Sequence, residues 1–172
     1  FTEIGECGVE ALVARLLDDD DDQTRKLSIL VLRELGPVAA AAVPVLDRLL
    51  RETQEDELAA IIMAALMQIG TASESAASAI LRRFLTGNRE LAGYAEEALK
   101  RIGPGVIPAV ETAAQHATGA AKSRLEGLLA TLRLAEETRF LEFEKFNNDA
   151  AIALFVCVGD LYLEYGAISG RQ

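Results

Sequence analysis

The sequence predicts an all-α fold built from repeated helix pairs, and three observations support this prediction. First, an aliphatic residue followed by glycine recurs with glycine spacings of 31, 34 and 33 residues, at Gly5, Gly36, Gly70 and Gly103. Second, an amphipathic stretch precedes each of the last three glycines. Third, another apolar stretch follows each of them. A period of this length is typical of helical repeat proteins, in which every pair of helices covers the next.

The first helix of each predicted pair ends at the glycine. Its apolar residues recur at spacings of three and four, which places them in one stripe on one helical face. The three predicted first helices span Thr24–Leu35, Asp56–Ile69 and Asn88–Ile102. Glycine tolerates positive φ, so it is the residue with which a helix most easily turns back on itself.

The second helix of each pair follows the glycine. The three predicted second helices span Ala39–Arg51, Ser75–Leu85 and Gly105–His116. Pro37 and Pro104 cannot continue the preceding helix, because proline lacks the backbone N–H. Pro44 and Pro108 lie near the starts of second helices, where the missing N–H costs little. Four features of the sequence therefore agree on a helix–turn–helix unit.

Composition excludes several classes of protein. Of the 172 residues, 51% are hydrophobic and 26% are charged, which excludes intrinsic disorder and suits one domain with a small extension. The formal net charge of -10 disfavours non-specific binding to nucleic acids, whose phosphates a negative surface repels. The longest apolar runs, Leu58–Met67 and Ala150–Gly159, are shorter than the ~20 residues of a membrane span.

The cysteines indicate a reducing compartment. Cys7 and Cys157 lie at opposite ends of the chain and form no CxxC or Cys/His pattern, so we expect neither a disulfide framework nor a zinc site. A cytoplasmic location follows as the expectation. Because the first residue is Phe1 and no basic leader is present, we expect the sequence to be an excerpt from a longer protein.

Three stretches carry a resemblance to a known family. They are Asp20-Asp21-Asp22-Gln23-Thr24-Arg25, the helix end Leu35-Gly36-Pro37, and the apolar-Pro-x-Leu start of a second helix at Val43-Pro44-Val45-Leu46. Together they resemble the HEAT repeat, particularly its short bilin-lyase-type form, over about residues 4–134. The resemblance implies a right-handed α-α superhelix of about four helix pairs. It also implies a bacterial, non-enzymatic scaffold that binds protein partners, or alternatively a bilin-lyase-like protein that handles a chromophore.

The composition changes near residue 134. Six of the nine aromatic residues follow position 139, and Phe140, Phe143 and Phe146 recur every three residues. We therefore predict two domains, a HEAT-like solenoid over residues 1–134 and an aromatic-rich helical cap over residues 135–172. An exposed aromatic surface there would favour a homodimer. As an alternative, Phe155–Ser169 is similar to the first helix and turn of a bacterial helix-turn-helix, which would make the solenoid a sensor or assembly domain of a transcriptional regulator. Without a recognition helix, this fragment itself is expected to bind no nucleic acid.

Arginines on the predicted second helices form the candidate partner-binding surface. Alignment of the repeats places an arginine at one position in three successive units, and the resemblance puts second helices on the concave face. Arginine binds carboxylate and phosphate in bidentate fashion, which suits an acidic peptide. Alternatively, these side chains only pair with Glu10, Asp47 or Glu52 at the surface. The candidate residues are Arg15, Arg48, Arg51, Arg82 and Arg83.

No constellation for catalysis or metal binding is found. The acidic run Asp18–Asp22 lacks the glycine and glutamate of an EF-hand loop, so we interpret it as a turn whose last carboxylates cap a helix. His116 is the only histidine, which excludes the His-Glu iron site of deoxyhypusine hydroxylase-like HEAT enzymes and favours a place at a helix C-terminus. Phe84 and Tyr94 are expected in the core. We expect no enzymatic activity, no cofactor and no metal.

Overall fold

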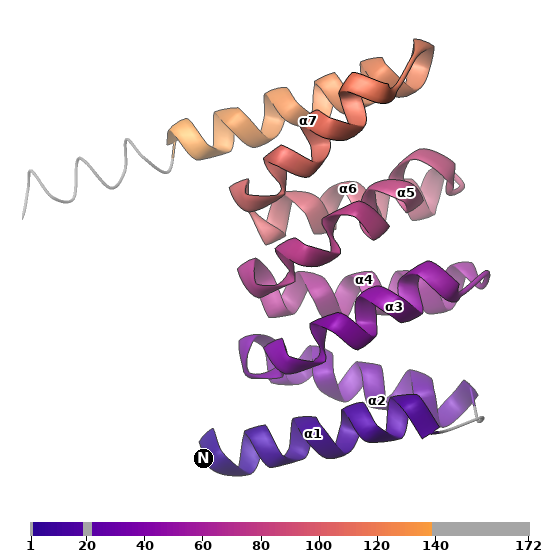
Figure 1. Ribbon diagram of the computed structural model, residues 1–172, viewed down its shortest axis with the longest axis vertical. Helices are drawn as coiled ribbons and strands as arrows, with labels where there is room; N and C mark the ends of the chain where they lie inside the picture. Colours follow the sequence, from indigo (N-terminus) through magenta and orange to yellow (C-terminus); the bar gives the residue numbers. More distant parts are fainter. Residues whose placement is uncertain (1, 19–21, 139–172) are drawn as a thin grey trace, which may run out of the picture. The chain divides into compact units, whose positions relative to one another are not determined.

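The computed structural model describes residues 2–18 and 22–138, and every regular element in that part of the chain is helical (Figure 1). The prediction of an all-α fold is confirmed. The chain divides into two compact units, Phe1–Arg133 and Leu134–Gln172, and the first of them carries the helix pairs. Of the predicted cap over residues 135–172, only residues 135–138 are described, as the end of a helix, and the helix-turn-helix-like segment lies outside the described residues.

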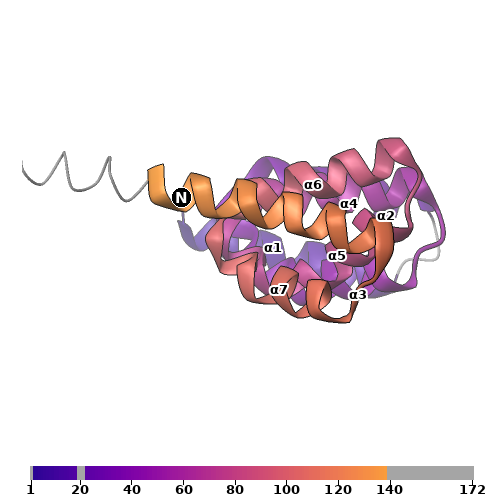
Figure 2. The ribbon, with the colours of Figure 1, turned by 90° about the horizontal axis from the view of Figure 1, so that it is seen from above.

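The first unit consists of α-helices that alternate between two layers (Figures 1 and 2). Helices α2, α4 and α6 pack side by side in one layer, and α3, α5 and α7 follow one another in the other. A last helix, residues 119–138, begins in this unit. The labelled helices are α1 (Thr2–Asp18), α2 (Asp22–Leu35), α3 (Val43–Glu52), α4 (Asp56–Ile69), α5 (Ala77–Thr86), α6 (Arg89–Ile102) and α7 (Ile107–His116).

Three of the four repeated glycines lie in turns, as predicted. Gly36, Gly70 and Gly103 follow the last residues of α2, α4 and α6, and their φ angles are 57°, 77° and 108°. Gly5 is the exception, because α1 runs without a break from Thr2 to Asp18. The absence of a following proline does not explain this difference, because Gly70 is followed by Thr71 and still turns.

The second helices start later than the sequence predicts. A 3-10 segment separates each turn from its helix, and these segments span Gly36–Ala42, Gly70–Ala76 and Pro104–Val106. Pro44 and Pro108 then occupy the first turns of α3 and α7. Ala39, Ala42 and Ala76 are fully buried, so the 3-10 segments pack into the core and are not free loops.

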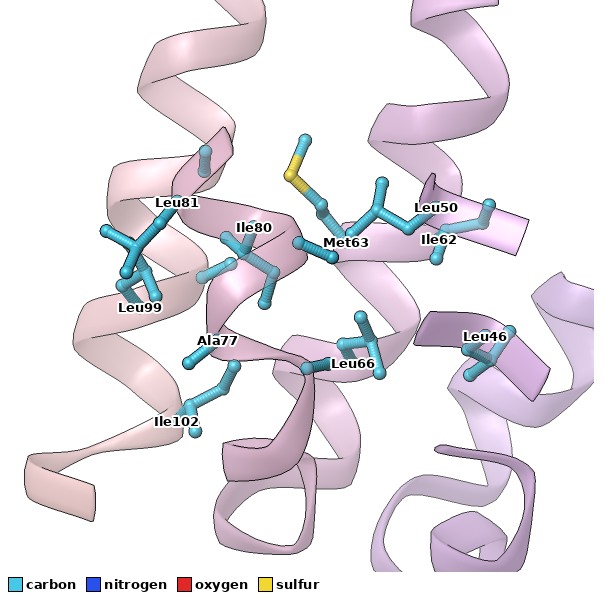
Figure 3. Packing of buried hydrophobic residues seen from close by; sticks show 14 of the residues in the cluster. Leu46, Leu50, Ile62, Met63, Leu66, Ala77, Ile80, Leu81, Leu99 and Ile102 are labelled. Carbon is cyan, nitrogen blue, oxygen red and sulfur yellow. The ribbon is translucent and has the colours of Figure 1, made fainter. Parts of the chain in front are cut away.

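One continuous apolar cluster joins the helices of the first unit. Leu46, Ile62, Leu66, Ile80 and Leu99 are fully buried and project between the two layers (Figure 3). Buried alanines lie among them and let successive helices approach closely; these are Ala59, Ala65, Ala95 and Ala98. Each large side chain buried in this way stabilises the fold by about 1.5–3 kcal/mol.

Two continuous helical stretches, Asp22–Glu52 and Asp56–Thr86, are long and apolar enough to cross a membrane by length and composition alone. Each stretch contains a turn glycine with positive φ, so neither is one straight helix. The longest α-helix in either is 14 residues, about 21 Å, which is shorter than the ~30 Å hydrocarbon core of a bilayer. Ile29, Leu46, Ile62 and Ile80 of these stretches belong to the core, whereas Leu27, Val31 and Val38 are exposed.

Candidate functional site

Two of the candidate arginines stabilise the end of a neighbouring helix. The Arg83 guanidinium donates hydrogen bonds to the Leu50 carbonyl oxygen at 3.1 Å and to that of Thr53. Arg82 donates to the Arg51 carbonyl oxygen at 2.9 Å. The last carbonyl groups of a helix have no partner within it and carry partial negative charge, so a cation there is favourable. These two side chains therefore link α5 to the C-terminus of α3.

The candidate arginines of α3 form pairs within their own helix. Arg51 donates to Asp47 at 3.0 Å and to the Ser78 hydroxyl at 2.8 Å, and Arg48 donates to Glu52 at 2.8 Å. The Glu52 carboxylate raises the pKa of Arg48 above its ordinary value. The predicted surface pairing with Asp47 and Glu52 is thus confirmed. The Arg48 side chain is 68% exposed.

The structure does not bring the arginines into a single column. The buried positions of α3 and α5 correspond, so that Val43, Leu46 and Leu50 match Ala77, Ile80 and Phe84. This register pairs Arg48 with Arg82 and leaves Arg83 opposite Leu49. Arg15 lies in the last turn of α1. Alignment of the sequence on the Arg-Leu motif pairs Arg48 with Arg83, which is one residue away from the register given by the buried residues. The sequence motif alone does not show which side of each helix is buried.

Arg124, on the last helix, also binds a carbonyl oxygen near the C-terminus of a second helix, α5. It donates to the Phe84 carbonyl oxygen at 2.6 Å, and its guanidinium lies 4.4 Å from the centre of the Phe84 ring. Phe84 itself is buried, as predicted. Within the described residues, arginines thus bind carbonyl oxygens near the C-termini of two second helices, from α5 onto α3 and from the last helix onto α5. No short-range pattern in the sequence identifies the second contact, since its partners are 40 residues apart.

Substitution of Arg83 by glutamine is expected to lower the free energy of unfolding by about 1–2 kcal/mol, because two carbonyl oxygens lose a charged donor. Arg48→Gln is the matched control, since Arg48 contacts only an exposed carboxylate on its own helix. We expect the control to leave the midpoint of urea denaturation unchanged. Equal midpoints for Arg83→Gln and Arg48→Gln would show that the contacts between α5 and α3 contribute nothing.

Polar contacts also link the N-termini of successive first helices. Lys26 of α2 donates to Glu55 at 2.6 Å and to Glu57 of α4 at 2.7 Å. The hydrogen bond from Lys26 lowers the pKa of the Glu57 carboxyl below its ordinary value. Asn88 accepts from the backbone N–H of Leu91 as the N-cap of α6, and its amide donates to Asp56 at 2.7 Å. These contacts fix the spacing of α2, α4 and α6 at one end.

A groove lies between the N-terminal halves of α4 and α6 and has a volume of about 390 Å³. We call it the α4–α6 groove; it is lined by Asp56, Glu57, Ala60, Ile61, Asn88, Glu90, Leu91 and Tyr94. Tyr94 is 46% exposed, so its assignment to the core was wrong. Tyr94 lies at the edge of the buried face of α6, three residues after Leu91 and four before Ala98, which are both buried.

A second groove, of about 700 Å³, lies between α6 and the last helix. Phe84, Arg89, Glu96, Arg124 and Leu128 are among the residues that line it. Gly87, Gly93 and Gly127 also border this groove. An added Cβ at Gly93 or Gly127 would meet no atom within 4 Å. Its charges are mixed, and Arg124 is already bound to Phe84.

The other candidates from the sequence lie partly within the described residues. No group of three or more metal-ligating side chains occurs among the described residues. His116 is exposed in the last turn of α7, and Asp22 accepts a hydrogen bond from Arg25 at 2.7 Å in the first turn of α2. No protein-family model, curated protein or solved structure matches this chain. Functional inference therefore depends on the residues and their geometry.

Proposed function

We propose that this chain is a HEAT-like, right-handed solenoid that acts as a non-enzymatic scaffold and binds a protein partner in the cytoplasm. Helix pairs that pack mainly on their neighbours, in two layers, support the solenoid. Such a stack presents an extended surface on which many modest contacts can add up.

The observation that carries the proposal is a row of apolar side chains repeated on the exposed side of the first helices. Leu27, Ile61 and Tyr94 each lie eight residues before the last residue of α2, α4 and α6. Leu27 is 54% and Tyr94 46% exposed, and Ile61 is partly buried. We call these three residues the first-helix row. Single exposed apolar residues are ordinary, but an apolar side chain at the same position in three successive repeats, exposed in two of them, supports an interaction surface.

The second-helix arginines remain a separate proposal for an acidic partner. Arg48 suits that role best among them, because its side chain is highly exposed and contacts only Glu52. Arg51, Arg82 and Arg83 already donate to groups of this chain, and binding a partner would require some of these bonds to break. The first-helix row requires no such exchange.

Partner capture from a lysate of the source cells tests the proposal. We expect the intact chain to retain a specific partner and the Leu27→Asp, Tyr94→Asp variant to lose it, because a carboxylate on an apolar contact surface must be desolvated on binding. Arg48→Glu is the control on the other face and is expected to retain the partner. Circular dichroism confirms that each variant is folded. Loss of the partner with Arg48→Glu alone would move the binding surface to the second helices.

A further inference from the structure

The α4–α6 groove combines an apolar interior with acidic edges. Its buried and half-buried side chains are apolar and include Leu91, which is 2% exposed, and Ile61. Its exposed side chains are Asn88, the Tyr94 ring and three carboxylates, which belong to Asp56, Glu57 and Glu90. The groove contains two members of the first-helix row, Ile61 and Tyr94. It is large enough for an anchoring side chain of a partner.

The carboxylates at this groove are only partly neutralised by other side chains of the chain. Lys26 is shared between Glu55 and Glu57, and the amide of Asn88 that binds Asp56 is neutral. No hydrogen bond or ion pair within the described residues engages the Glu90 carboxylate. Each carboxylate accepts more than one hydrogen bond, so Asp56 and Glu57 also keep capacity for a donor.

We propose that this groove binds an arginine side chain of a basic protein segment, an inference that rests on the scaffold function proposed above. The guanidinium is planar and stacks on an aromatic face, while its N–H groups donate to carboxylates. Its aliphatic stem packs on apolar surface. Tyr94, Glu90 and Ile61 supply these three kinds of contact at one place. The net charge of -10 attracts a basic segment from a distance.

Fluorescence anisotropy of the full chain with a labelled peptide rich in arginine and leucine tests the inference. The matched peptide carries glutamate at every arginine position, and we expect it not to bind. Tyr94→Ala is expected to weaken binding of the arginine peptide about two- to fivefold, the range for an exposed cation–aromatic contact. Tyr94→Phe, which keeps the ring, is expected to bind as the intact chain does.

Glu90 and Glu97 provide a matched pair of charge variants on α6. Both are exposed, but only Glu90 lines the groove. We expect Glu90→Gln to weaken binding of the arginine peptide and Glu97→Gln to leave it unchanged. Equal weakening by both variants would show that binding of the peptide depends only on the net charge of the chain, and would overturn the inference. Unchanged binding of the peptide by Tyr94→Ala would also overturn it.

The outcomes also separate this inference from the scaffold proposal. If the intact chain captures a partner from lysate that the Leu27→Asp, Tyr94→Asp variant loses, while the arginine peptide does not bind, the scaffold stands and the arginine assignment is wrong. If neither the partner nor the peptide is bound, both proposals fail.

Discussion

Leu66→Ala is expected to lower the free energy of unfolding by about 2–5 kcal/mol. Leu66 is fully buried on α4, which packs between α2 and α6 in its own layer. Its side chain projects into the core between this layer and the layer of α3 and α5 (Figure 3). Truncation removes its apolar contacts and leaves a cavity that the helices on both sides can close only in part. Urea denaturation followed by far-ultraviolet circular dichroism measures the loss.

Leu27→Ala is the matched control for this substitution. Leu27 lies on α2, and its side chain is 54% exposed, so the same truncation removes little buried surface. We expect its effect to stay within about 0.5 kcal/mol. A similar loss for both variants would show that α4 is not enclosed by its neighbours, and the packing described above would be wrong.

Gly70→Ala and Gly103→Ala are each expected to cost about 1–3 kcal/mol. The two residues have φ and ψ of 77° and -137°, and of 108° and -165°, which are angles that only glycine adopts readily. An added Cβ at Gly70 would meet no atom within 4 Å, so the expected loss there comes from the backbone alone. Thermal and urea denaturation measure it.

Gly93→Ala provides the opposite expectation. Gly93 lies inside α6, and an added Cβ there also meets nothing within 4 Å. Alanine favours the helix over glycine by up to about 1 kcal/mol, so this variant is expected to be as stable as the intact chain or more stable. If Gly70→Ala behaved like Gly93→Ala, the sharp turn after α4 would not exist.

The first helices could be predicted from the sequence almost to the residue. Predicted Asp56–Ile69 is the observed α4, and predicted Asn88–Ile102 differs from α6 only in that Asn88 is its N-cap. Amphipathic periodicity and the closing glycine are local signals, and here they agree with each other. At Gly5 the aliphatic-glycine signal was misleading, because α1 continues through that residue.

The surface could be predicted far less well. The pairing of Arg83 with carbonyl oxygens of α3 depends on the packing of two helices 30 or more residues apart, and no local pattern encodes it. The residue type does not help either, because an arginine is equally compatible with an exposed position in solvent and with a role as donor to the carbonyl groups at a helix C-terminus. The exposure of Tyr94 is also hard to predict, since Leu91 and Ala98, one helical turn away on either side, are buried and aromatic residues tend to be buried.

Amide hydrogen exchange of the chain with its captured partner tests the central claim most directly. If the partner binds the first-helix row, the amides of α4 and α6 around Ile61 and Tyr94 gain protection in the complex, and those of α3 and α5 do not. Protection confined to α3 and α5 would contradict this account and assign partner binding to the second helices.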